Sequence, residues 1–170
     1  MPVTLYTYVD LYDRLLGSLS HLLDKGEAFA REQGISNDEM LEWRLCGDMH
    51  PLRFQCAVVV NFTRSWTARV AGHEPPAGVD QMTVDFAGLR AGIADAKTHL
   101  AALKPEHFEG RDDVPLTVQI TDTLSPTFPA GQWLSVFAST NIYFHLSMAY
   151  AILRMKGVPI GKIDLFAGRL

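Results

Sequence analysis

Apolar residues recur at intervals of three and four positions in four long stretches of this 170-residue chain. Such spacing places the apolar side chains on one face of an α-helix, and that face has to be buried against another element. The four stretches span residues 9–33, 51–72, 83–105 and 131–156, with Thr83 as the expected N-cap of the third. Four amphipathic helices in a chain of this length favour an all-α four-helix bundle, with residues 1–170 as one domain.

Residues with special backbone preferences mark the expected helix ends. Gly34 and Gly72 follow the first and second helices, where a glycine suits a left-handed cap. Pro51 fits the first turn of the second helix, because that position needs no backbone N–H. Ser36 followed by Glu39 fits a capping box and predicts a short helix after the first long one.

The pattern changes in the segment PLTVQIT at residues 115–121. Here Leu116, Val118 and Ile120 alternate with polar residues, which is the period-two pattern of a half-buried β-strand. A partner strand is expected around residues 127–128, after a Ser-Pro turn. The sequence therefore predicts a small β-hairpin directly before the last helix.

Composition and charge exclude several classes of protein. The net charge is −4 and no basic stripe is visible, so we expect no nucleic-acid binding. The beginning of the chain lacks the pattern of a signal peptide, and no run of about 18 apolar residues predicts a membrane span. Cys46 and Cys56 have neither disulfide-framework nor zinc-site spacing. These features together predict a cytoplasmic protein with free thiols.

One histidine, His145, lies in the middle of the apolar fourth helix, with Asn141 one turn before it. Residues four apart share a helix face, so both side chains point the same way. A buried histidine needs a hydrogen-bond partner, and an amide one turn away can supply one. The pair is therefore either a satisfied polar spot in the core or part of a cavity between helices, where bundles place ligands and metals.

A second set of polar residues lies in GDMHPLRFQ, residues 47–55, at the start of the second helix. Asp48 and His50 flank the helix start, where Asp48 is suited to capping and to a favourable interaction with the helix dipole. Gln55 interrupts the apolar face of its helix and needs a buried partner. We expect that partner to be Asn141, His145 or a ligand.

Motifs that would name a reaction are absent from the sequence. It contains no nucleophile elbow, phosphate-binding glycine loop or HExxH pair. Histidine plus amide is also a poor ligand set for zinc, so a metal would need His50 or Asp48 as a second strong ligand. Four further histidines are expected at solvated positions: His21, His73, His99 and His107.

Two stretches of the chain resemble a known group of proteins. GDMHPLRFQ and NIYFHLSMAYAILRMKGVPIGKIDLF, at residues 47–55 and 141–166, are similar to the two signature stretches of a DinB-like branch catalogued as a domain of unknown function. LSHLLDKGEAFAREQGI and VAGHEPPA also resemble it, so the likeness covers nearly the whole chain. The resemblance implies the DinB/YfiT-like fold, a four-helix bundle with an unusual helix order, and a homodimer.

The resemblance also implies a metal site. Well-studied relatives bind a divalent metal through three histidines, one on the second helix and two spaced H-x-x-x-H on the last, and some use it for thiol-dependent transfer. His145 matches the second histidine of that pair, whereas Asn141 takes the place of the first. His50 is the only histidine near the second-helix position. Neutral amides are poor ligands for zinc or nickel, so this departure weakens the expected metal binding.

The sequence leaves three hypotheses for the function. The first is binding, with or without conversion, of a small organic molecule in a metal-free pocket, where His145 acts as acid or base, Asn141 positions it, and Gln55, Asp48 and Tyr150 contact the ligand. The second is a transferase or hydrolase that depends on zinc or nickel held by His145 with His50 or Asp48. The third is a non-catalytic interaction protein whose polar cluster is structural.

Overall fold

The fold is built mainly from helices, as a computed structural model of residues 3–168 shows. The helices are α1 (Thr7–Glu32), α2 (Asn37–Leu41), α3 (Leu52–Ala71), α4 (Phe86–Ala102), α5 (Ala130–Gln132) and α6 (Ser139–Met155). Strands β1 (Pro115–Thr117) and β2 (Thr127–Pro129) form an antiparallel pair, and short 3₁₀ turns cover Pro105–Phe108 and Lys162–Phe166. This is the predicted all-α bundle with a small hairpin before the last helix.

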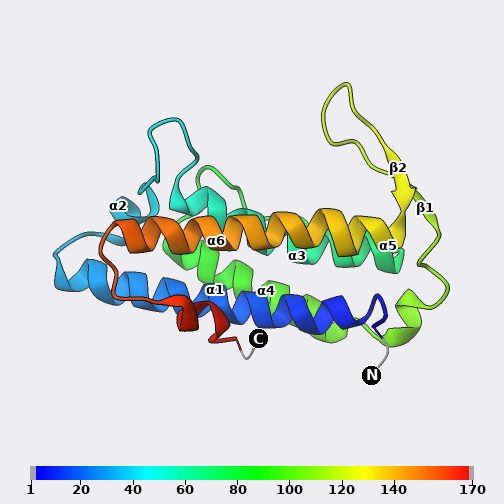
Figure 1. Cartoon of the computed structure of the whole chain (residues 1–170), viewed down its shortest axis with the longest axis horizontal. Coiled ribbons are helices and arrows are strands. Elements are labelled where there is room, and N and C mark those ends of the chain that lie inside the picture. The colour runs from blue at the N-terminus through cyan, green and yellow to red at the C-terminus, as the bar shows by residue number, and fades with distance from the viewer. Residues whose placement is uncertain (1–2, 169–170) are drawn as a thin grey trace.

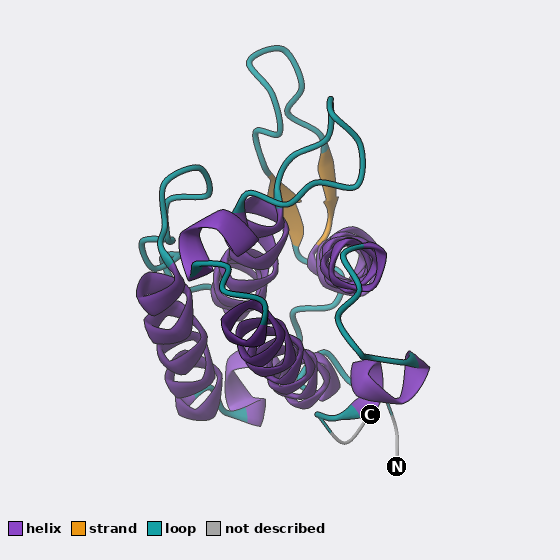
Figure 2. Cartoon of the chain, turned by 90° about the vertical axis from the view of Figure 1, so that its left-hand side faces the viewer, coloured by secondary structure: helices purple, strands orange, loops and turns teal. Residues whose placement is uncertain are grey.

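The four long helices enclose one hydrophobic core. Helix α3 packs against both α4 and α6, and α1 packs against the same two helices from the opposite side. Figure 2 shows this arrangement from one end, with the hairpin lying outside the bundle. Helices α3 and α6 run in opposite directions, so the start of α3 lies beside the second half of α6. This α3–α6 seam carries Gln55 and His145, two of the residues that the sequence singled out.

Helix ends follow the predicted caps at Gly34, Ser36 and Gly72, whereas Pro51 is the N-cap of α3 and lies just before its first turn. Gly34 and Gly72 have φ of +68° and +80°, the left-handed conformation that glycine adopts without steric cost. The Ser36 hydroxyl accepts a hydrogen bond from the Glu39 N–H at 3.1 Å and starts α2. The prediction for the third helix was wrong, because Asp85, and not Thr83, caps α4 by accepting from the Gly88 N–H at 2.7 Å.

The predicted fourth helix is continuous but contains a wider turn. Residues Trp133–Ala138 form a π-helical turn between α5 and α6. The Leu134 carbonyl in this turn accepts hydrogen bonds from the buried Tyr12 hydroxyl at 2.8 Å and from the Ser139 hydroxyl at 3.0 Å. Burial raises the pKa of Tyr12, which therefore stays a neutral donor. The extra donors stabilise a turn that sequence periodicity does not reveal.

The hairpin is shorter than the alternation predicts. Regular pairing covers Pro115–Thr117 and Thr127–Pro129, and a single bridge between Thr121 and Leu124 follows nearer the tip. The residues from Val118 to Pro126 form a loop whose tip stands away from the bundle (Figure 1), whereas Val118 at its start packs against the core. The base of the hairpin is fixed to the last helix, because the Trp133 indole N–H donates to the Leu116 carbonyl at 2.8 Å.

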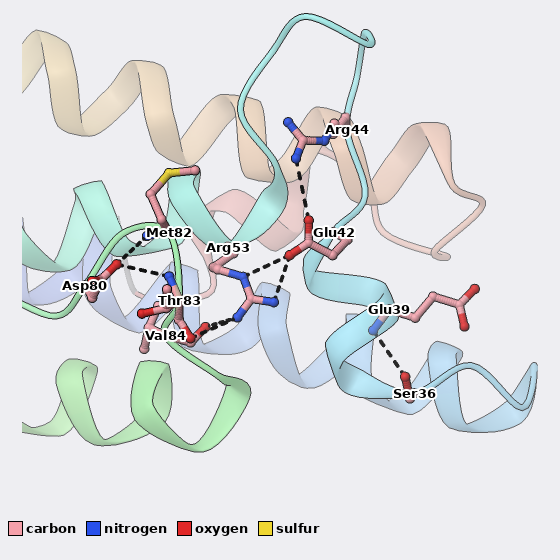
Figure 3. Close-up of polar contacts among 9 residues, drawn as sticks. All are labelled: Ser36, Glu39, Glu42, Arg44, Arg53, Asp80, Met82, Thr83 and Val84. Carbon is pink, nitrogen blue, oxygen red and sulfur yellow. Dashed lines mark hydrogen bonds and ion pairs between the residues drawn. The ribbon is translucent and has the colours of Figure 1, made fainter.

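A buried arginine holds the segment between α2 and α3. The Arg53 side chain, on a residue only 8% exposed, donates to the Glu42 carboxylate at 2.9 and 3.1 Å and to the carbonyls of Thr83 and Val84 (Figure 3). These bonds join the α2–α3 loop, the first turn of α3 and the segment before α4. The loop that carries His50 is therefore anchored on both sides.

We predict that Arg53→Met lowers the free energy of unfolding by about 2–3 kcal/mol, because the Glu42 carboxylate and the carbonyls of Thr83 and Val84 lose their charged donor. Urea unfolding followed by circular dichroism measures this change. Arg31→Met, at an exposed position of α1, is the matched control and should change stability by less than about 0.5 kcal/mol. Equal effects of the two substitutions on stability would contradict the role of Arg53 in holding the segment between α2 and α3.

Candidate functional site

A chain of hydrogen bonds joins the start of α3 to the middle of α6. The Gln55 side-chain amide N–H donates to the backbone carbonyl of His50 at 3.0 Å. Its carbonyl oxygen Oε1 lies 2.7 Å from Nδ1 of His145. Gln55 is 3% exposed, so it is the buried polar group that the sequence marked as needing a partner. Of the three partners considered from sequence, the structure gives His145.

This arrangement decides which nitrogen of His145 carries the proton. The bond to the His50 carbonyl orients the Gln55 amide, so its oxygen, an acceptor only, faces His145. Nδ1 must therefore be the N–H donor. In the neutral ring Nε2 then has a free lone pair, which can accept a proton or a hydrogen bond.

The surroundings of His145 favour its neutral form. Burial lowers the pKa of His145 from its ordinary value of 6.5, and the charge of nearby His50 lowers it further. Aromatic rings flank the imidazole: Phe54 lies 5.9 Å away edge-on and Phe144 5.1 Å away, between ring centroids. The half-buried imidazole thus carries a basic nitrogen on a ring that contacts two phenylalanine rings.

Asn141 lies on the same helix face as His145 but does not position it. Its amide N–H donates to the Phe137 carbonyl at 2.8 Å, one turn back in the same helix and inside the π-helical turn. The expectation that Asn141 holds His145 was therefore wrong. An amide on the neighbouring helix takes that role because it approaches Nδ1 from across the seam, whereas Asn141 binds its own backbone.

The remaining predicted site residues are dispersed. Asp48 is exposed and does not cap α3, whose N-cap is Pro51 without a side-chain bond. The His50 ring is also exposed and stacks on Phe54 at 3.9 Å, so its contribution to the site is its backbone carbonyl and its charge. Tyr150 is half-buried against the core. It follows His145 by five residues, about 140° around the helix, and therefore points to another side.

These residues do not fit the three-histidine metal site that the sequence resemblance implies. A metal needs several ligand atoms aimed at one point, and only Nε2 of His145 offers a strong one here. The Gln55 oxygen is occupied by His145, and the Asn141 amide is a weak ligand. Within residues 3–168 no group of three or more His, Cys, Asp and Glu side chains lies close enough to hold an ion.

Sequence reasoning missed the aromatic side chains around the site. Phe54 precedes Gln55 and Phe144 precedes His145, so each aromatic residue is adjacent to a polar residue that had been identified. The missed signal was this repeated Phe-polar pairing on two helices that face each other.

Comparisons with known proteins agree with the resemblance found in the sequence. A family model described as "Domain of unknown function (DUF1993)" matches residues 5–166. The crystal structure of a DinB family member from Shewanella denitrificans is similar, with a TM-score of 0.85 and 28% identity, over 95% of this chain and 90% of that one. No curated protein matches significantly. The DinB-like branch and the fold predicted from sequence are thereby confirmed.

We predict that His145 titrates below 6.5 in the folded protein, and that His50→Gln moves its pKa upward, because one of the two causes is removed. NMR titration of the ring C–H signals measures both values. Since the unfolded chain binds more protons than the folded one below pH 6.5, stability should fall as the solution is acidified through this range. An unshifted His145, or no response to His50→Gln, would contradict the described environment.

Proposed function

The chain belongs to the DUF1993 family of DinB-like proteins, and we propose that it binds a small organic molecule at His145 without a metal ion. The observation that carries this proposal is the relay from the His50 carbonyl through Gln55 to Nδ1 of His145. A histidine oriented in this way by a hydrogen bond at Nδ1 presents Nε2 as an acceptor or base.

The surroundings of Nε2 indicate the chemistry of the ligand. A lone pair recognises a molecule with an O–H or N–H donor, and the rings of Phe54 and Phe144 suit an aromatic or apolar body. A ligand proton transferred to Nε2 would leave an imidazolium whose Nδ1–H is already held by Gln55. The same geometry therefore supports binding and general-base catalysis, with His145 as the base.

Phenol and indole are suitable probes, because each joins one donor group to an aromatic body. We predict that His145→Ala weakens their binding about fivefold to thirtyfold, the usual effect of losing one hydrogen bond of about 1–2 kcal/mol. Saturation-transfer NMR titrations measure the affinities. Gln55→Met, which keeps the side-chain length but removes the acceptor, should weaken binding in the same direction.

The matched control is His99→Ala, because His99 is also half-buried but lies on α4 and contacts Thr67. It should leave the affinities unchanged. Equal binding by wild type and His145→Ala would refute the proposed site.

A second candidate function, self-association, is supported by the outer face of α6. The sequence from Ala130 to Leu153 contains no Asp, Glu, Lys or Arg. Several large apolar side chains on this segment are exposed: Val136 is 61% exposed, Tyr143 44% and Phe144 52%. We infer that this face pairs with the same face of a second copy, since an uncharged apolar surface is complementary to itself.

The continuous helix from Ala130 to Met155 is also long and apolar enough, by length and composition, to cross a membrane. Its inner side packs against α1 and α3, as a core helix of a bundle does. We assign its apolar composition to that core and to the proposed pairing face.

Tyr143→Glu is predicted to convert a dimer into a monomer, because it places a charge in the middle of the apolar face. Sedimentation velocity measures the change in oligomeric state. Glu32→Gln, at an exposed position at the end of α1, serves as a control that should not alter the mass of the assembly. A wild-type chain that is monomeric at high micromolar concentration would contradict self-association.

A further inference from the structure

A hollow of about 250 Å³ lies at the opposite end of the α3–α6 seam from His145, between α3, the π-helical turn and the hairpin loop. Its floor consists of aromatic rings. Phe62 stacks on Phe137 with centroids 6.0 Å apart, and Trp66 contacts Phe137 edge-on at 5.2 Å. The apolar side chains of Val118 and Ile120 close it from the hairpin side.

One positive charge lies at this hollow. Arg69 lines it, is exposed, and has its guanidinium carbon 6.0 Å from the centre of the Trp66 ring. No carboxylate of the described chain is within ion-pair distance of Arg69, and the lining includes no Asp or Glu. The Ser65 hydroxyl and the Gln119 amide complete the polar groups of the rim.

We propose that this hollow binds an aromatic carboxylate of one or two rings. The ring system would lie on the Phe62, Trp66 and Phe137 surface, where stacking and edge-on contacts are favourable. The carboxylate would pair with Arg69, whose planar guanidinium matches its two oxygens. A cation without an acidic partner beside aromatic walls selects for an anion over a neutral molecule of the same shape.

This site is separate from the one proposed at His145. Gln55 and Arg69 are 14 positions apart on α3, which corresponds to about 20 Å along the helix axis. The two proposals therefore stand or fall independently.

The test uses 2-naphthoate as the probe and its neutral analogue 2-naphthamide as the comparison. Two-dimensional NMR of the whole chain follows the indole N–H signal of Trp66, which lines the hollow, with that of Trp43 as a remote internal control. We expect 2-naphthoate to shift the Trp66 signal with a Kd of about 1 mM or tighter, an affinity within reach of a ligand with this number of atoms. We expect 2-naphthamide to bind at least about tenfold more weakly.

Two variants test the assignment of the residues. Arg69→Gln, at an exposed position that should not affect folding, should weaken 2-naphthoate about tenfold or more and abolish its preference over the amide. Ser65→Phe should fill the hollow and block both molecules. His145→Ala should change neither affinity.

Four results would overturn the proposal. They are no saturable shift of Trp66, equal affinity for the acid and the amide, unchanged affinity in Arg69→Gln, or loss of binding in His145→Ala. The last result would place the probe at His145 instead, and would leave the function proposed there intact.

Discussion

The hydrogen bond between Gln55 and His145 is the interaction on which the candidate site depends. It crosses the seam between α3 and α6, and at 2.7 Å it is a short bond between two side chains far apart in sequence. Because the Gln55 amide is itself held by the His50 carbonyl, the bond fixes which nitrogen of the imidazole is basic. The hydrogen bonds of Arg53 to Glu42 and Thr83 anchor the segment that supplies this carbonyl. The packing around α2 therefore helps to fix the orientation of Gln55 and, through it, the protonation of His145.

The α3–α6 seam changes character along its length. Near His145 it presents a buried amide and an imidazole between two phenylalanines. Towards the hairpin it becomes aromatic, with Trp66 stacked on Trp133 at 4.9 Å and Arg69 at the rim. At Gln55 and Asn141 the chain has side-chain amides, which are poor metal ligands and good hydrogen-bonding groups.

Sequence reasoning predicted the bundle well because helical periodicity and caps are local signals. The C-terminal end of α3 and the start of α2 follow directly from Gly72 and Ser36. Features set by distant contacts were missed. The π-helical turn depends on Tyr12, which is 122 positions away from the carbonyl it binds. The regular pairing of the hairpin is shorter than its alternation suggests, and its base is fixed to the bundle through the Trp133 indole.

The site itself was only half predictable. That Gln55 needed a buried partner followed from its position on an apolar face, and the structure supplies His145. That Asn141 binds its own helix could not be read from its spacing, since an amide at that position can turn towards either neighbour.

The measurement that tests this account most directly is the tautomer of His145, read from the nitrogen-15 shifts of its imidazole by long-range proton–nitrogen NMR at neutral pH. The account predicts a protonated Nδ1 and an unprotonated Nε2, with the Nδ1 signal altered in Gln55→Met. A protonated Nε2, or a fully charged ring at pH 7, would contradict it, because no basic nitrogen would then face a ligand.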